Sequence, residues 1–246
     1  MEVTVLAINA MNNYYRIADQ RKKHNLSIKE RIASKDPTLF FITEVSQDCE
    51  VEEFDLPEYK IFGLPASREK TLGSVVGIKI DTLKDDCSFE DYSAKWFIHR
   101  GVQVDFVLKN DMFLSVLGIY PASFGSNFCP EIFTRMIDWI DSQVKKRTNF
   151  IVAGDLNCDT DSKGVNFPQY DFTHLKILAN QYDAWLDGNA IKKGESTTKP
   201  SQKTRIDRIF TNLTIKYIEH SWNEFESLSD HAVIFSELQL KDVADN

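Results

Sequence analysis

Polar side chains recur where the short apolar runs of this sequence begin or end. They are Asn9 after VTVLAI, Glu44 after LFFIT, Tyr120 at the end of MFLSVLGIY, Asp155 and Asn157 after FIVAG, Asp207 within RIDRIF, and Ser229-Asp230-His231 before AVIF. A polar group at the edge of a buried strand costs free energy unless it is paired. Their recurrence in one chain predicts a shared polar centre at one rim of the sheets, where a rigid scaffold can hold chemistry. Carboxylate and amide oxygens suit a hard divalent cation such as Mg²⁺.

Each position also has an ordinary structural explanation when it is taken alone. These are a solvated strand end for Glu44, a turn for Asp155 and Asn157, a salt bridge from Asp207 to Arg205 or Arg208, and a capped turn for Ser229-Asp230 with His231 as a hydrogen-bonded core histidine. The recurrence of all of them, in this order, favours the shared centre. A serine nucleophile is disfavoured, because adjacent side chains on an extended segment point to opposite faces and cannot form a triad.

The elements that must position these residues are mostly strands. Short apolar, β-rich runs lie at 3–8, 39–45, 74–80, 102–108, 112–120, 149–154, 205–211 and 231–238. Several are apolar at nearly every position, as in strands buried on both faces. Helical spacing is found at 14–34, at 130–146 after a starting Pro130, and at 172–186 with Thr173 as a possible N-cap. This order predicts two sheets packed face to face with helices outside.

Length and composition point to one globular domain. The chain has 246 residues, of which 42% are hydrophobic and 27% charged, and we expect a single domain at 1–240 with a C-terminal tail at 241–246. The net charge of −8 is unfavourable for nucleic-acid binding. A carboxylate cluster that holds a metal makes a chain acidic while the bound ion reverses the local field, and basic residues bunch at 21–23, 145–147 and 192–208.

The four cysteines and the chain start bear on location. Cys49, Cys87, Cys129 and Cys158 form no CxxC pair, so we interpret them as reduced thiols of an intracellular protein. The first fifteen residues lack the pattern of a signal peptide, and no run has the length of a membrane span. We therefore expect a protein that is not secreted and does not contact a membrane.

The motifs taken together resemble the endonuclease/exonuclease/phosphatase superfamily, which has the DNase I-like fold. The matching segments are AIN (7–9), FITEV (41–45), GIYP (118–121), AGDLN (153–157), RIDRIF (205–210) and LSDHAVI (228–234), which cover essentially the whole chain. The resemblance implies an α+β fold, a four-layer α/β/β/α sandwich of two mainly antiparallel sheets flanked by helices. Within the superfamily, TRIDRIFTN and HLKILANQYDAWLDG are most similar to the endonuclease domain of LINE-type (non-LTR) retrotransposons.

The resemblance also implies a role for each matched residue. Glu44 would be the principal ligand of Mg²⁺ (Mn²⁺ could substitute), supported by Asn9, with Asp230 as a second ligand; Asp155 would position or deprotonate the water, Asn157 and Tyr120 would hold the phosphate, and His231, oriented by Asp207, would contact it. DNA contacts are expected from Ser229 (which also supports its loop), Thr198 or its neighbour Thr197, Ser123, Lys203 and Arg205. Two departures put contacts in doubt: Met11 replaces a polar residue, and Ser123 replaces an asparagine.

The implied activity is a Mg²⁺-dependent nick in one strand of double-stranded DNA that leaves a 3′-hydroxyl and a 5′-phosphate. In a retrotransposon the domain would be fused to a reverse transcriptase, act in the nucleus, and be monomeric when isolated. Alternatives on the same fold are an abasic-site repair endonuclease, an inositol-lipid phosphatase, a sphingomyelinase or an RNA deadenylase. A degenerate domain that binds nucleic acid without cutting it is the non-enzymatic alternative.

Overall fold

Twelve strands form two sheets in the computed structural model. The structure describes residues 1–11, 17–46, 51–54, 56–63, 72–85, 89–92, 100–121, 130–158, 173–198, 204–222 and 229–241. The seven-stranded sheet runs in the order β3 (Tyr59–Phe62), β4 (Leu72–Lys79), β2 (Leu39–Ser46), β1 (Glu2–Asn9), β12 (Val233–Gln239), β11 (Thr214–Ser221) and β9 (Ile191–Lys193). The five-stranded sheet runs β10 (Asp207–Thr211), β8 (Asn149–Asp155), β7 (Phe113–Ile119), β6 (Gly101–Val107) and β5 (Glu90–Asp91).

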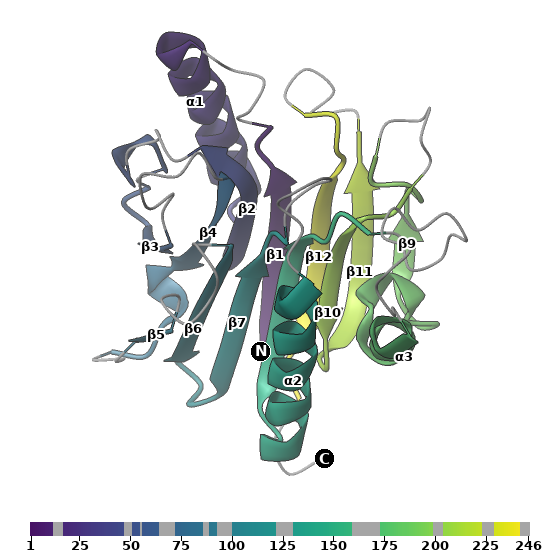
Figure 1. Cartoon of the computed structure of the whole chain (residues 1–246). Helices are drawn as coiled ribbons and strands as arrows, with labels where there is room; N and C mark the ends of the chain where they lie inside the picture. Colours follow the sequence, from purple (N-terminus) through teal and green to yellow (C-terminus); the bar gives the residue numbers. More distant parts are fainter. Residues whose placement is uncertain are drawn as a thin grey trace.

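The described residues include three α-helices. They are α1 (Ala18–Lys35), α2 (Pro130–Lys146) and α3 (Thr173–Tyr182), and 3₁₀ turns lie at η2 (Val51–Phe54), η3 (Ile80–Thr82) and η6 (Ala184–Leu186). Figure 1 shows α2 in front of the strands and α1 and α3 toward opposite sides. No described helix is long and apolar enough to cross a membrane.

Strand alternation explains the layering. In β1, Val3 and Val5 join the core between the sheets, whereas Leu6 packs in a second cluster that includes Ile28 and Ile32 of α1. This is the period-two pattern of a strand buried on both faces. The seven-stranded sheet therefore lies between α1 and the five-stranded sheet.

The five-stranded sheet follows the same rule. In β8, Ile151 faces the core between the sheets, and Phe150 and Val152 face a cluster that includes Phe133 of α2 and Leu178 of α3. The order of layers is α1, seven-stranded sheet, five-stranded sheet, and α2 with α3. This confirms the expected α/β/β/α sandwich. Within the described strands, β1–β2, β7–β8 and β9–β11 pair in parallel and the other pairs are antiparallel.

The pairing brings several strand ends to one edge. β1 is parallel to β2 and antiparallel to β12, and β8 is parallel to β7 and antiparallel to β10. The last residues of β1, β2, β7 and β8 and the first residues of β10 and β12 therefore lie at the same edge, which we call the polar rim. Figure 1 shows the arrowheads of β1 and β2 pointing toward this edge, at the top of the view.

Some elements differ from the sequence-based prediction. Helix α1 begins at Ala18, and the expected 14–16 segment lies outside the described residues. The helix expected over 172–186 ends at Tyr182, where Asp183 accepts a hydrogen bond from the Trp185 amide and η6 begins. Strands β3, β5, β9 and β11 were not predicted. Strand β11 alternates buried and partly exposed residues, so it has no continuous apolar run.

Candidate functional site

Asp155, Asp207 and His231 meet at the polar rim. Asp155 ends β8, Asp207 begins β10, and the two residues are register partners on neighbouring strands. His231 Nδ1 donates to Asp207 Oδ2 at 2.7 Å and lies 4.0 Å from Asp155 Oδ2. Asp155 is fully buried and Asp207 nearly so. Strand pairing therefore fixes two carboxylates side by side, with an imidazole against both.

The other sheet contributes Asn9 and Glu44. Asn9 Nδ2 donates to Asp155 Oδ2 at 3.0 Å, which joins the two sheets through side chains. Tyr120 OH donates to Glu44 Oε1 at 3.2 Å. The β2–β4 register shifts between Ile42 and Val45, and Glu44 has a φ of 55°. A bulge re-aims a side chain, and a non-glycine residue with positive φ is frequent at functional sites.

Asp230 and Met11 complete this side of the rim. Asp230 Oδ1 lies 3.9 Å from His231 Nε2. The Asp230 amide lies 2.7 Å from Met11 Sδ, and the Met11 amide donates to Asn9 Oδ1 at 2.9 Å. Met11 therefore contacts the Asp230 backbone, at the position where the resemblance leads one to expect a polar residue.

Asn157 presents an unused donor at the rim. Its backbone amide donates to Asp155 Oδ1 at 2.7 Å, and its φ of 51° suits asparagine. Its side-chain Nδ2 is buried and has no hydrogen-bond partner among the described residues. An unpaired buried donor is costly, so this amide is suited to an acceptor oxygen of a substrate.

Gly154 allows β8 to reach the rim beside β7. Its φ is +152°, and a Cβ at this position would lie 1.9 Å from the Ile119 carbonyl oxygen. Only glycine combines this backbone conformation with such a close approach. The glycine of the GDLN segment therefore places Asp155 next to the end of β7, where Tyr120 follows.

The carboxylates at the rim are held in an environment that opposes their charge. Burial, followed by the charge of Asp207, raises the pKa of Asp155 to about 8. Burial also raises the pKa of Glu44, against the lowering effect of hydrogen bonds from Asn9 and Tyr120. The ionised forms of these carboxylates are thus disfavoured in a desolvated place, and a bound cation would stabilise them.

At His231, in contrast, the surroundings favour the charged form of the side chain. Burial alone lowers the pKa of the imidazole, but Asp207, Asp155 and Glu44 outweigh it and raise that pKa to about 10. The ring is therefore an imidazolium at neutral pH. A protonated imidazole donates hydrogen bonds from both nitrogens and does not ligate a metal.

The donor set fits a hard divalent cation. Among the described residues, Asp155, Asp207 and His231 have ligand atoms that all lie within 4.8 Å of one another. This group differs from the predicted ligands Glu44, Asn9 and Asp230. Because His231 is cationic and bonded to Asp207, oxygen atoms are the ligands that the rim offers, and oxygen ligands suit Mg²⁺ and Mn²⁺.

Ser229 has a local structural contact. Its hydroxyl accepts a hydrogen bond from the His231 backbone amide at 3.1 Å, and the residue is buried. The His231 ring bonds Asp207 instead of the Ser229 hydroxyl, so these two residues do not form the serine–histidine pair that nucleophilic catalysis requires. This agrees with the interpretation that Ser229 supports its loop.

Thr198 and Arg205, from which DNA contacts are expected, are both buried in the free protein. Thr198 is 2% exposed, and its hydroxyl is hydrogen-bonded to Thr204. Arg205 is buried, and its guanidinium donates to Asp183 at 2.7 Å. Both side chains are turned inward and engaged within the protein. Ser123 and Lys203 lie outside the described residues, so their expected contacts remain predictions.

Asp183 is a residue whose importance sequence reasoning missed. Its carboxylate binds both Arg205 and Arg208, each at 2.7 Å or less, and all three side chains are buried. The alternative that Asp207 pairs with Arg205 or Arg208 is therefore wrong, because both arginines bind Asp183. The signal was present in the segment YDAWLD, where an acidic residue follows an apolar helix face.

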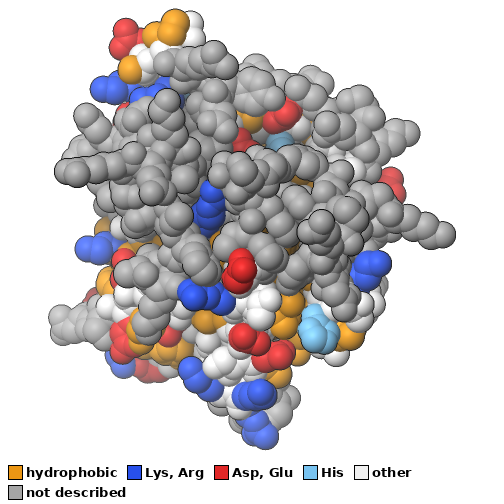
Figure 2. Space-filling view, in the orientation of Figure 1, with side chains coloured by type: hydrophobic (Ala, Val, Ile, Leu, Met, Phe, Trp, Pro, Cys, Tyr) orange, Lys and Arg blue, Asp and Glu red, His pale blue; other side chains and the backbone are white. Residues whose placement is uncertain are grey.

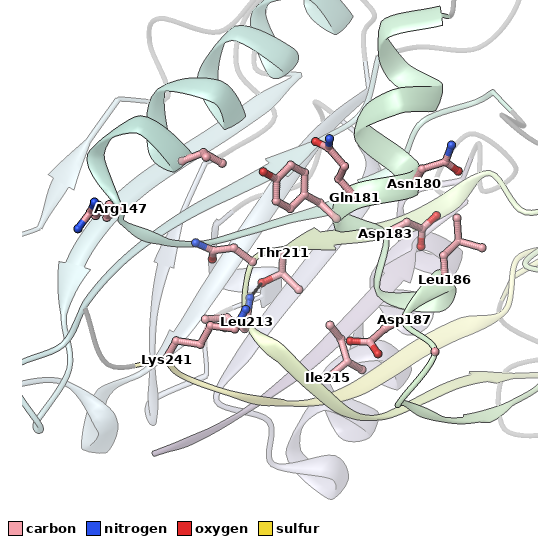
Figure 3. A pocket seen from close by; sticks show the side chains of 14 residues that line it. Arg147, Asn180, Gln181, Asp183, Leu186, Asp187, Thr211, Leu213, Ile215 and Lys241 are labelled. Carbon is pink, nitrogen blue, oxygen red and sulfur yellow. Dashed lines mark hydrogen bonds between the residues drawn. The ribbon is translucent and has the colours of Figure 1, made fainter. Parts of the chain in front are cut away.

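A cavity of about 650 Å³ lies away from the polar rim (Figure 3). Its lining includes Arg147, Asp187, Thr211 and Lys241. Thr211 ends β10, whereas Asp207 begins it. Four strand residues span roughly 13 Å, so this cavity is separate from the catalytic candidates.

Figure 2 shows acidic and histidine side chains close together near the upper edge of the molecule.

Comparison with solved structures supports the fold. An endonuclease/exonuclease/phosphatase from Bacteroides vulgatus superposes with a TM-score of 0.70 at 16% identity, over 98% of this chain and 100% of that one. A functionally unknown conserved protein from Enterococcus faecalis gives 0.70 at 13% identity, over 97% and 100%. Truncated TDP2 from Caenorhabditis elegans gives 0.66 at 14% identity, over 98% of each chain. No curated protein sequence matches the chain.

A sequence-family model adds an independent match. It is described as the endonuclease/exonuclease/phosphatase family, and it matches residues 12–231. The match spans all the rim residues from Glu44 to His231, and the fold and the clustered carboxylates agree with it. The chain belongs to the endonuclease/exonuclease/phosphatase family.

Proposed function

We propose that this protein is a Mg²⁺-dependent phosphodiesterase that nicks DNA. Family membership implies a hydrolase of phosphoesters. The observation that carries the proposal is the convergence of Asp155, Asp207 and His231, beside the unpaired amide of Asn157, at one rim. A phosphodiester needs an activated water, neutralised phosphoryl oxygens and a stabilised leaving group, and these residues supply matching groups.

The metal ligands in this proposal are Glu44 and Asp230, with Asn9 supporting them. A bound Mg²⁺ would neutralise charge on the phosphoryl oxygens and on the leaving oxygen. The Tyr120 hydroxyl already donates a hydrogen bond to Glu44. In the complex with substrate, this phenol turns its donor to a non-bridging phosphate oxygen.

Asp155 and His231 act on the reacting atoms. Asp155 orients the attacking water and accepts its proton, a role suited to a carboxylate whose pKa is raised to about 8. The water oxygen bonds to phosphorus as the bond from phosphorus to the 3′-oxygen breaks; the 3′-oxyanion then takes a proton from solvent, which leaves a 3′-hydroxyl and a 5′-phosphate. The His231 imidazolium, held by Asp207, donates a hydrogen bond to the phosphate, and Asn157 Nδ2 donates another.

Plasmid nicking tests this proposal directly. The protein is incubated with supercoiled plasmid in Mg²⁺, in Mn²⁺ and in EDTA, and open-circle product is measured. We expect product only with a divalent cation, and a loss of two or more orders of magnitude for Asp155→Ala and His231→Ala. Nicking at the wild-type rate by either variant would refute the role assignment.

A carboxylate outside the rim gives a matched control. Asp105 on β6 accepts a hydrogen bond from Ser115 at 2.8 Å, and it is a partly buried aspartate of the five-stranded sheet. Asp105→Ala removes one acidic side chain without changing the rim. It should nick at the wild-type rate, so equal losses in Asp105→Ala and Asp155→Ala would indicate general damage to the fold.

DNA as substrate, and a retrotransposon setting, are the narrower parts of the proposal. They rest on the similarity of TRIDRIFTN and HLKILANQYDAWLDG to LINE-type endonuclease domains. Mapping the nicks distinguishes a defined repeat or an A/T-rich junction from an abasic site. Hydrolysis of inositol phosphates or sphingomyelin with no plasmid nicking would favour another phosphodiesterase or phosphatase of this family.

The partners that we propose follow from the similarity to LINE-type endonuclease domains. Double-stranded DNA would be the partner, in a nuclear setting, and the domain would act beside a reverse transcriptase. Arg205 and Arg208 are buried, so the basic stretch 192–208 offers fewer cations to phosphates than its composition indicates. We therefore expect weak DNA affinity in the absence of Mg²⁺, with a shallow dependence on salt.

A further inference from the structure

Thr197 contacts both segments that carry the Asp207–His231 pair. The residue is fully buried, and its hydroxyl accepts hydrogen bonds from the amides of Ile206 at 3.0 Å and Asp207 at 3.1 Å. Its backbone carbonyl accepts from the Ala232 amide at 2.8 Å. One threonine thus joins the start of β10 to the residue that follows His231.

The position of the pair explains why such a link matters. Asp207 is the first residue of β10, and His231 lies two residues before the start of β12. Strand ladders hold residues inside a sheet, but at a strand end the backbone depends on other partners. The 2.7 Å bond between His231 and Asp207 therefore lies where the β10 and β12 ladders begin, and His231 itself pairs with Thr198 in an isolated bridge.

The same contacts reach the neighbourhood of Asp155. The Ile206 amide donates to Thr197, while the Ile206 carbonyl accepts from the Leu156 amide at 2.9 Å. Leu156 follows Asp155 directly in the chain. The Thr197 hydroxyl therefore bonds the Asp207 amide directly, and it reaches the neighbour of Asp155 through two hydrogen bonds by way of Ile206.

This geometry does not suit Thr197 for a contact with DNA. A hydroxyl oxygen has two lone pairs, and two backbone amides occupy both positions. The side chain has no exposed surface. The hydroxyl instead acts as a buried hydrogen-bond acceptor that fixes the backbone at Ile206 and Asp207.

We propose that Thr197 is a positioning residue that holds Asp207 and His231 at bonding distance by accepting three hydrogen bonds from backbone amides, two at its hydroxyl and one at its carbonyl. The proposal rests on the phosphodiesterase function proposed above. In this proposal, Thr197, which lies before β10 in the chain, supports catalysis without touching the substrate. Loss of the hydroxyl leaves the amides of Ile206 and Asp207 without their acceptor, and the carboxylate moves relative to the imidazole.

The test compares three variants on supercoiled plasmid with Mg²⁺. Thr197→Val keeps the shape and removes the hydroxyl, and Thr197→Ser keeps the hydroxyl. The matched control is Thr211→Val, at the other end of β10. Thr211 is also buried, and its hydroxyl donates to the Phe150 carbonyl at 2.6 Å and accepts from the Leu213 amide at 3.1 Å.

We expect Thr197→Val to lower kcat for nicking by about 10–100-fold, the range for outer-shell partners of catalytic groups, with KM within about twofold. Thr197→Ser should recover most of kcat. Thr211→Val should lose similar thermal stability but keep kcat. Equal kcat in Thr197→Val and Thr211→Val would overturn the proposal.

Two further measurements separate positioning from general damage. In a His231→Ala background, Thr197→Val should lower the residual rate by less than about twofold, because residues that act through one group are non-additive. In NMR spectra, the low-field Nδ1 proton of His231 should shift or broaden in Thr197→Val and stay in Thr211→Val. A wild-type protein that cuts no plasmid would refute the proposed function, and the NMR comparison would still decide the position of Thr197.

Discussion

The side chains at the polar rim differ in how completely they are bonded within the protein. Asp207 holds the His231 ring, and Glu44 accepts from Tyr120. Asn157 is different, because its side-chain amide is buried without a partner. The free protein therefore pays a desolvation cost at Asn157 that a phosphate oxygen would recover on binding.

Asn157→Gly tests this interpretation at the residue scale. Glycine tolerates the φ of 51° and removes only the amide side chain. We expect a loss of about tenfold or more in kcat/KM for nicking, with a change of less than about 1 kcal/mol in the free energy of unfolding. Chemical denaturation and nicking kinetics measure both. Unchanged kcat/KM would remove Asn157 from the phosphate site.

A second residue-scale prediction concerns His220, which stacks on Trp185 with ring centroids 4.1 Å apart. Burial lowers the pKa of His220 to about 4, against the raising effect of its hydrogen bond to the Glu195 carbonyl. The folded-state pKa is below the ordinary 6.5, so the folded protein binds fewer protons than the unfolded chain. The stability contributed by neutral His220 is present above pH 6.5 and is lost as the pH falls toward 4.

Protonation of His220 should lower the free energy of unfolding by about 3 kcal/mol at pH 4. The free energy of unfolding is measured at pH 7 and at pH 4.5 in the wild type and in His220→Phe, which keeps an aromatic ring against Trp185. We expect a smaller decrease in the variant, because phenylalanine does not titrate. The same decrease in both proteins would assign the acid sensitivity to other groups.

At the scale of elements, the approach of β8 to β7 depends on Gly154. Gly154→Ala would place a Cβ 1.9 Å from the Ile119 carbonyl oxygen in a backbone conformation that alanine avoids. We expect a loss of about 3 kcal/mol in the free energy of unfolding, from overpacking and backbone strain together. Urea denaturation measures this loss.

Gly188 supplies the control for that substitution. A Cβ at Gly188 would meet no atom within 4 Å, and its φ is not in the left-handed region. Gly188→Ala should change the free energy of unfolding by less than about 0.5 kcal/mol. Similar losses at both positions would contradict the assigned role of Gly154.

The sequence was most informative where elements are apolar on both faces. The runs at 3–8, 39–45 and 149–154 predicted β1, β2 and β8 because burial on both faces leaves a continuous apolar signal. Helix α2 was predicted at its observed bounds. The edge strand β9 was missed, since its three residues are exposed and carry no periodicity.

The site was predicted less completely than the fold. The convergence of Glu44, Asp155 and His231 at one rim follows from their places at strand ends. The inward orientation of Arg205 does not follow from sequence, because a local basic stretch looks like a solvated surface. Its partner Asp183 is distant in the chain, and only the packing of η6 against β10 brings them together.

At the scale of the whole molecule, both sheets contribute polar side chains to the rim. Asn9 and Glu44 come from the seven-stranded sheet, and Asp155 and Asp207 come from the five-stranded sheet. A cation bound among them would join the sheets, so the metal should stabilise the whole fold. Binding to the folded state alone adds RT ln(1 + [L]/Kd) to its stability.

We expect saturating Mg²⁺ to raise the thermal midpoint by about 5 °C relative to EDTA, from about 2–3 kcal/mol of binding linkage. Glu44→Gln should abolish most of this increase, whereas Asp105→Asn should keep it. Thermal unfolding is followed at the same ionic strength in every sample, so that charge screening is equal. An increase of the same size in Glu44→Gln would place the ion elsewhere.

Strand β1 lies in the middle of its sheet between β2 and β12, and Glu2 pairs with Gln239. During synthesis on a ribosome, the first strand must wait for almost the entire domain before its second neighbour leaves the exit tunnel. Until β12 emerges, the partial sheet therefore presents an open edge to other nascent chains. The same pairing makes the polar rim one of the last parts of the domain to be completed during synthesis, because His231 lies two residues before β12.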